Sequence, residues 1–276
     1  MPELPEVRTV VKALKSKILN TTFTNVVVLL DKLIKNASMQ EFCNYLIGEK
    51  ILDIYNVGKN IVFKLTNNKN LISHLRMSGK YFTQENIGVN RQHDHIIFTL
   101  DNQIKLFYND TRQFGTFHIK NNNDLFTTAP LNKLGKNLED INIDELHQSI
   151  RKKSIPVKSF LLDQSYILGI GNIYANEILF ASKISPWTKV NRIPLLKWKE
   201  IINNAKQILD KSTELGGSTI NDYSSLNAVE GQFQNFLKVH LKTNKPCVVC
   251  GKEIEQTVLA QRMTYYCPNC QKENYE

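Results

Sequence analysis

Four cysteines near the end of the chain form two Cys-x-x-Cys pairs, with sixteen residues between the pairs. The pairs are Cys247 with Cys250 and Cys267 with Cys270. Four thiolates at this spacing are the ligand set of a closed tetrahedral zinc site. Such a site has no open position for a substrate, so we expect one structural Zn²⁺ as the cofactor. The alternative, two redox dithiols, requires a βαβ context that the surrounding sequence lacks.

The segment between the two cysteine pairs is predicted to form a β-hairpin, with strands at residues 254–257 and 263–266. Gln261 and Arg262 then lie near the tip of this hairpin. An arginine on a rigid, exposed tip suits contact with a phosphate, although many such arginines are only solvated.

The chain begins MPELPE, and this segment has two interpretations. Proline and glutamate are both favoured in the first turn of a helix, so the segment could simply start one. Alternatively, removal of Met1 would expose the secondary amine of Pro2. An α-amine has a pKa near 8, so at neutral pH roughly a tenth of it is uncharged, some hundreds of times the fraction for lysine. Such an amine could attack a sugar C1′ and form an iminium intermediate, with Glu3 in reach for proton transfer.

The composition is that of a soluble globular protein with a basic excess. The 276 residues include 35 lysines and arginines against 26 acidic residues, a formal net charge of +9. A charge of this sign favours a polyanionic partner such as nucleic acid, and it fits a merely soluble basic protein equally well. No apolar run is long enough to span a bilayer and no signal peptide is recognisable, so we expect a cytoplasmic protein.

Two kinds of segment must position these residues. Apolar residues recur with a helical period from 7 to 18, and strands are then predicted at 23–30, 51–57, 60–65, 71–75, 95–100 and 103–108. Short strands separated by polar turns favour a sandwich or barrel. Helices are predicted at 144–152, 157–163, 172–182 and 194–212, and a glycine- and serine-rich loop at 216–231.

Several short motifs make the chain resemble the bacterial formamidopyrimidine-DNA glycosylase (Fpg) family from residue 2 to residue 271. They are PELPE at 2–6, GK at 58–59, HLRMSG at 74–79, HDH at 93–95, NDTRQFG at 109–115, LLDQ at 161–164, GIGNIYA at 169–175 and YCPNCQ at 266–271. Their order and spacing together are specific. The resemblance implies an α+β multidomain fold with an N-terminal β-sandwich at 1–132, a helical helix-two-turn-helix domain at 133–235 and a C-terminal zinc-finger β-hairpin at 236–276.

The resemblance also implies a DNA glycosylase with AP lyase activity, which repairs oxidised purines such as 8-oxoguanine and formamidopyrimidines. Pro2 would be the Schiff-base nucleophile, and Glu3 the general acid/base that helps to open the sugar ring. Lys59 would neutralise phosphate and assist β-elimination. Arg262 would hold the phosphate beside the lesion and assist δ-elimination.

Three residues match side chains that fill the space left when a damaged base is turned out of the stack, namely Met77, Arg112 and Phe114. Asn172, which opens a helix after Gly171, would bind phosphate together with free backbone N–H groups. By composition alone, Met77 and Phe114 would more often be core residues, and the glycine–asparagine pair an ordinary helix start.

Two histidines and a lysine complete the expected DNA contacts. His74 and His93 match family positions near the DNA backbone, although a lone histidine on a strand is usually structural. Lys153 stands beside Ser154, where many members of the family have a DNA-contacting lysine, and could replace it.

The expected partner is damaged double-stranded DNA, with no membrane and no small-molecule cofactor, and the protein is expected to be a monomer at the bacterial nucleoid. The nearest alternative is an endonuclease VIII-like enzyme, with the same fold and amine but oxidised pyrimidines as substrates. Leu4 and the pair Arg112 and Phe114 favour purines. An alternative from another class is a catalytically silent zinc-finger DNA-binding protein.

Some positions depart from the usual sequence of the family. Thr111 and Gln113 stand where basic or proline residues are usual, and Gln261 stands where glycine usually precedes the arginine. Residues 134–137 lack the usual acidic-proline sequence. None of these changes touches the expected chemistry, but they leave DNA affinity and the preferred partner base open.

Overall fold

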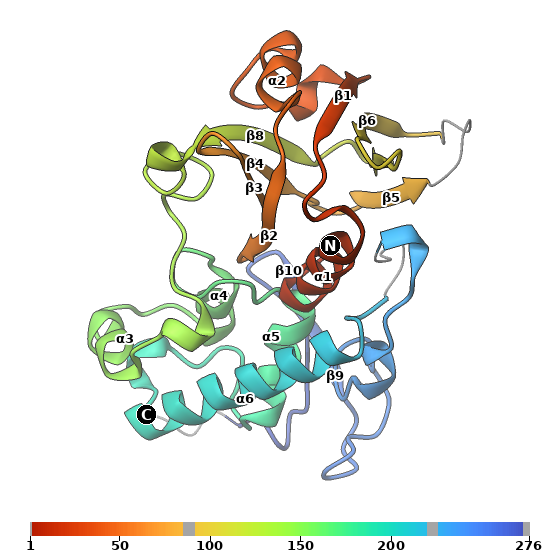
Figure 1. Cartoon of the computed structure of the whole chain (residues 1–276). Helices are drawn as coiled ribbons and strands as arrows, with labels where there is room; N and C mark the ends of the chain where they lie inside the picture. The colour runs from red at the N-terminus through yellow and green to blue at the C-terminus, as the bar shows by residue number, and fades with distance from the viewer. Residues whose placement is uncertain (1, 85–91, 220–225, 273–276) are drawn as a thin grey trace. The chain divides into compact units, whose positions relative to one another are not determined.

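The computed structural model describes residues 2–84, 92–219 and 226–272 and divides into two compact units (Figure 1). The first unit is Met1–Lys133 together with Leu215–Gln232, and the second is Leu134–Glu214 together with Phe233–Glu276. The chain therefore passes from one unit to the other three times. Within the described residues, no helix is both long enough and apolar enough to cross a membrane.

The first unit contains two four-stranded antiparallel sheets, which confirms the predicted β-sandwich. One sheet has the order β1-β6-β7-β5, with β1 at Phe23–Val28, β6 at Asp94–Leu100, β7 at Lys105–Asn109 and β5 at Lys80–Gln84. The other has the order β2-β3-β4-β8, with β2 at Ile51–Val57, β3 at Asn60–Leu65, β4 at Lys69–His74 and β8 at Thr116–Asn121. Two helices accompany the sheets, α1 at Leu4–Ile18 and α2 at Met39–Leu46.

A single apolar core joins both sheets to α1. The helix buries one side at the predicted spacing, and Leu14 on that side has no exposed surface. Full burial of one such side chain stabilises the fold by about 2 kcal/mol. The rings of Tyr108 and Phe117 meet edge to face, with centroids 4.7 Å apart. This core fixes where α1 begins, and therefore where the N-terminus of the chain is held.

One α-helix and two strands of the first unit were not predicted, namely α2, β5 and β8. Helix α2 begins at a capping box, in which Ser38 N–H donates to Glu41 Oε2 at 2.7 Å and Glu41 N–H donates to Ser38 Oγ at 3.3 Å. Strand β8 lies at an edge of its sheet, where β4 is its one neighbouring strand among the described residues. Its burial does not alternate cleanly, so a pattern of period two is weak there.

The second unit is helical and carries a two-stranded hairpin, as predicted. Its helices are α3 at Ile143–Ile150, α4 at Val157–Leu162, α5 at Asn172–Ala181 and α6 at Leu195–Glu214. The hairpin pairs β9 at Glu255–Leu259 with β10 at Arg262–Tyr266. Helix α5 packs against α4, α6 and β10, so it supports both the other helices and the hairpin.

Candidate functional site

Pro2 and Glu3 are both buried immediately ahead of α1, and Glu3 is only 3% exposed. The backbone N–H of Glu3 donates to Glu6 Oε2 at 2.8 Å. A carboxylate in the first turn of a helix also interacts favourably with the helix dipole. The local fold therefore fixes the backbone that follows the expected nucleophile. Met1 lies outside the described residues.

Glu6 also holds a second segment, which the sequence analysis did not foresee. Its other oxygen, Oε1, accepts the backbone N–H of Ser218 at 2.7 Å, and the side chain is 1% exposed. One carboxylate thus joins the start of α1 to the chain at 217–218. Gly217 lies in the left-handed region with φ +83°, and a Cβ there would stand 2.8 Å from Glu6 Oε1.

Substitution of Gly217 by alanine is expected to destabilise the first unit by about 1–3 kcal/mol, through backbone strain and a clash with Glu6. Gly216 is a matched control, because its φ is +77° but the nearest atom to an added Cβ is 3.5 Å away. The Gly216→Ala variant should show strain of the backbone alone. Denaturant unfolding of both variants measures the difference. Equal losses would mean that the approach to Glu6 carries no cost.

Lys59 and His74 lie near each other at the ends of two paired strands. Lys59, 7% exposed, directly precedes β3, and His74 ends β4 in register with Asn60. Burial, together with the positive charges of Arg76 and Lys59, lowers the pKa of His74 to about 3. Its Nδ1 accepts the backbone N–H of Arg76 at 3.0 Å. The imidazole is therefore neutral at neutral pH and carries its proton on Nε2.

Asp110 organises the loop that carries two of the three expected space-filling residues. It is fully buried, and its carboxylate accepts the backbone N–H of Arg112 at 3.2 Å and of Gly115 at 2.8 Å. The same carboxylate accepts the hydroxyl of Ser78, which is the neighbour of Met77. Because one buried group binds both loops, it sets their relative position. The sequence analysis assigned no role to Asp110 or Ser78.

The three space-filling candidates are not core residues, contrary to what composition favours for two of them. Met77 is 41% exposed and Phe114 is 53% exposed. The guanidinium of Arg112 lies 5.2 Å from the centroid of the Phe114 ring. Their exposure leaves these side chains available to a ligand. His93 is half-buried, and its carbonyl accepts the backbone N–H of Asp110 at 3.1 Å, which connects it to the same loop.

In the second unit, Asn172 is the first residue of α5 and follows Gly171 as predicted. Its side-chain amide donates to Met263 O at 3.0 Å, so the structure brings Asn172 to the residue that follows Arg262. Gln164, another residue that sequence reasoning missed, accepts the N–H of Gly169 at 2.8 Å and shapes the loop ahead of the helix.

Lys153 and Arg262 differ in how they are held. The ammonium of Lys153 lies 5.0 Å from the centroid of the Tyr166 ring, and Ser154 beside it is exposed. Arg262 is exposed and opens β10 directly after a two-residue turn. The turn residues Ala260 and Gln261 have φ of 48° and 60°, as a type I′ hairpin requires. This turn sets the direction in which the arginine leaves the hairpin.

The four predicted zinc ligands are brought together. The Sγ atoms of Cys247, Cys250, Cys267 and Cys270 all lie within 4.8 Å of one another. Two of the separations are 3.8 Å and 3.5 Å. Sulfur atoms at the corners of a tetrahedron around zinc, each bonded at about 2.3 Å, stand about 3.8 Å apart. The donor set and its spacing therefore fit one structural Zn²⁺.

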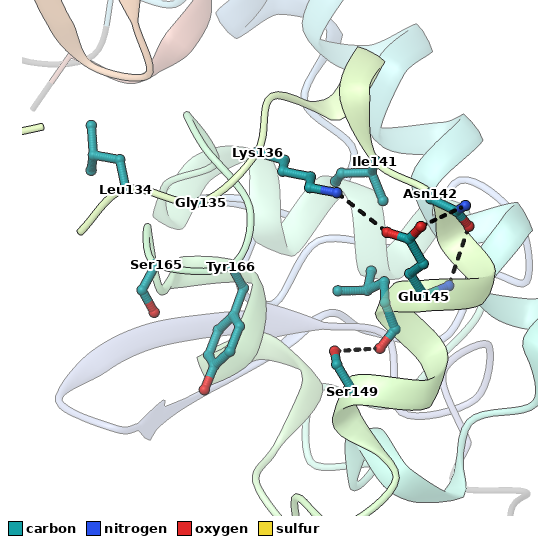
Figure 2. A pocket seen from close by; sticks show the side chains of 10 residues that line it. Leu134, Gly135, Lys136, Ile141, Asn142, Glu145, Ser149, Ser165 and Tyr166 are labelled. Carbon is teal, nitrogen blue, oxygen red and sulfur yellow. Dashed lines mark hydrogen bonds and ion pairs between the residues drawn. The ribbon is translucent and has the colours of Figure 1, made fainter. Parts of the chain in front are cut away.

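A separate cavity of about 400 Å³ lies in the second unit (Figure 2). Lys136 and Glu145 meet across it at 3.4 Å, both well exposed, and Tyr166 lies on another side. An exposed ion pair of this kind contributes little stability. None of the residues predicted to act in chemistry or in DNA binding lines this cavity.

Three protein-family models match the chain in order. They are the formamidopyrimidine-DNA glycosylase N-terminal domain at residues 1–117, the formamidopyrimidine-DNA glycosylase H2TH domain at 134–224, and the zinc finger found in FPG and IleRS at 244–272. The formamidopyrimidine-DNA glycosylase of Mycoplasmopsis pulmonis is 50% identical over 99% of both chains. That of Mycoplasma mobile is 46% identical over 99% of this chain and 100% of its own.

Solved structures show the same similarity. A complex between a Lactococcus lactis FPG mutant and Fapy-dG-containing DNA superposes with a TM-score of 0.93, at 32% identity, over 99% of this chain and 100% of that one. MutM in complex with DNA that contains carbocyclic 8-oxo-G superposes with a TM-score of 0.91, at 31% identity, over 99% of this chain and 100% of that one.

Proposed function

The chain belongs to the formamidopyrimidine-DNA glycosylase family, and we propose that it excises oxidised purines from duplex DNA and then cleaves the strand. The substrates are 8-oxoguanine and formamidopyrimidines, and the strand is cut by β- and δ-elimination. The observation that carries this proposal is the buried Pro2-Glu3 pair ahead of α1, held by Glu6. A chain that only bound DNA would have no need to brace the backbone directly after Pro2 in this way.

In the proposed reaction, the Pro2 amine attacks C1′ of the damaged nucleoside and forms an iminium as the base departs. Glu3 transfers the proton that opens the sugar ring. Lys59 neutralises phosphate and assists β-elimination. Arg262 binds the phosphate beside the lesion and assists δ-elimination.

The DNA contacts follow from exposure and hydrogen bonding. Met77, Arg112 and Phe114, held by Asp110 and Ser78, fill the space of the extruded base, because their exposed side chains can replace its stacking. Four further residues contact the phosphate backbone. They are His74, which donates its Nε2–H, and His93, Lys153 and Asn172.

The proposal includes the domain boundaries, the cellular location and the oligomeric state of the protein. The domains are an N-terminal catalytic domain at 1–132, a DNA-binding domain at 133–235 and a zinc finger at 236–276. The protein acts as a cytoplasmic monomer on damaged double-stranded DNA. Light scattering of the purified protein, alone and with a lesion duplex, tests the monomeric state.

Borohydride reduction during the reaction with an 8-oxoguanine duplex tests the enzymatic proposal. We expect a covalent protein–DNA adduct whose attachment maps to Pro2 by mass spectrometry. Parallel assays on thymine glycol separate purine from pyrimidine repair, because an endonuclease VIII-like enzyme would excise the pyrimidine more rapidly. Absence of the adduct from a preparation whose N-terminus is Pro2 would leave a DNA-binding protein without a nucleophile.

A further inference from the structure

A fully buried lysine of α4 contacts the hairpin at the two residues that follow Arg262 in the sequence. Lys158 has no exposed surface, and its Nζ donates to Met263 O at 3.0 Å and to Thr264 Oγ1 at 2.8 Å. Thr264 is also fully buried. A charged donor in such surroundings forms stronger hydrogen bonds than a neutral one, and its loss removes one donor from each of these two acceptors of the hairpin.

The contact continues to Arg262 itself. The Thr264 hydroxyl that accepts from Lys158 donates its own proton to Arg262 O at 3.1 Å. A chain of two hydrogen bonds therefore runs from the Lys158 ammonium through the Thr264 hydroxyl to the carbonyl oxygen of Arg262. The two hydrogen bonds polarise one another, because the Thr264 hydroxyl is the acceptor in one and the donor in the other.

We propose that Lys158 and Thr264 are positioning residues that fix the backbone of Arg262 and thereby aim its guanidinium at a DNA phosphate. This inference rests on the proposed function of Arg262 in phosphate binding and δ-elimination. Asn172 takes part as well, since its side-chain amide also donates to Met263 O. Two elements of the DNA-binding unit thus hold the first residues of β10.

The entry of the chain into the finger has a separate anchor. The buried carboxylate of Glu177 accepts the backbone N–H groups of Lys238 at 2.9 Å, Val239 at 3.0 Å and His240 at 2.8 Å. Breaking the link from Lys158 to Thr264 should therefore leave the finger attached and its four thiolates in place. The effect of such a change is expected on the direction of Arg262, with little effect on zinc content.

The test compares Lys158→Met and Thr264→Val with Thr264→Ser, which keeps the hydroxyl, and with Lys199→Met, an equal loss of charge at an exposed position of α6. The probe is a duplex with a tetrahydrofuran abasic site. Lys158→Met and Thr264→Val should each weaken binding about tenfold, the effect of one lost charge-assisted hydrogen bond. Both should also flatten the salt dependence of binding and lower the ratio of δ- to β-elimination product, because a phosphate contact is lost.

Thr264→Ser and Lys199→Met should behave as the unmodified protein in all three measurements. The double variant of Lys158 and Thr264 should lose no more than either single change, since both break one link. Lys158→Met alone could lower zinc content or stability. In that case, the comparison of Thr264→Val with Thr264→Ser shows whether the link to Arg262 affects DNA binding.

The positioning role would be overturned if Lys158→Met and Thr264→Val both matched the Lys199→Met control. The match would have to hold for DNA binding, for its salt dependence and for the ratio of elimination products. Failure of the unmodified protein to form a borohydride-trapped adduct would instead count against the proposed function. The binding and salt measurements report on Arg262 independently of that outcome.

Discussion

A protein that carries one additional residue ahead of Pro2 is expected to form no covalent adduct with lesion DNA. Its strand cleavage should fall on the order of a thousandfold or more, as is found when a covalent nucleophile is removed. The reason is chemical. Acylation converts the secondary amine into an amide, which has no basic lone pair with which to attack C1′.

The measurement uses two preparations, one whose N-terminal mass shows Pro2 and one that retains a preceding residue. Borohydride trapping and cleavage of an 8-oxoguanine duplex are compared, and binding to a tetrahydrofuran duplex is measured in parallel. The same added residue at the C-terminus is the control and should leave activity unchanged. Full cleavage by the extended protein would show that another group, such as a lysine, is the nucleophile.

Loss of the metal is expected to have the second large effect. Replacement of Cys267, which has no exposed surface, by serine should abolish stoichiometric zinc. The apolar cluster beneath the finger is small, and two of its members are themselves zinc ligands, Cys247 and Cys267. Without the metal this cluster cannot hold the hairpin, because metal binding and folding are coupled in such modules. DNA affinity should then fall about a hundredfold through loss of charged phosphate contacts.

Zinc analysis, circular dichroism and binding to a tetrahydrofuran duplex test this expectation. The matched control is Cys43→Ser, a change at a half-buried cysteine of the first unit whose thiol donates to Val26 O at 3.4 Å. That variant should retain zinc and affinity. Helical content should persist in Cys267→Ser, since α4, α5 and α6 pack on one another. Unchanged DNA affinity in a zinc-free Cys267→Ser protein would exclude the finger from DNA binding.

Much of the fold could be predicted because its signals are local. Strands β2 and β3 have the predicted bounds, and α1 buries the predicted apolar positions. The cysteine spacing predicts the metal site, since a tetrahedral thiolate set needs nothing beyond the four ligands. Helix α2 carried a readable capping signal in Ser38 and Glu41, which the apolar periodicity alone did not reveal.

The parts that could not be predicted depend on contacts between distant residues. Asp110 reads as an ordinary turn residue until the fold places Ser78 beside it, 32 residues away in the chain. Lys158 lies in a basic stretch and reads as a solvated lysine, yet it is fully buried against the hairpin 106 residues later. No periodicity or composition carries such pairings, because they arise from tertiary packing.

The discontinuous makeup of the first unit has a consequence for the time at which the molecule becomes complete during its synthesis. Glu6 leaves the ribosome among the first residues, but its partner Ser218 follows 212 residues later. At about 5–20 residues per second, that interval is on the order of 10–40 seconds. The sandwich can form early, but the Glu6 carboxylate in the first turn of α1 must wait for a partner that is made after most of the helical unit. The segment that is synthesised first is therefore among the last to make all its native contacts.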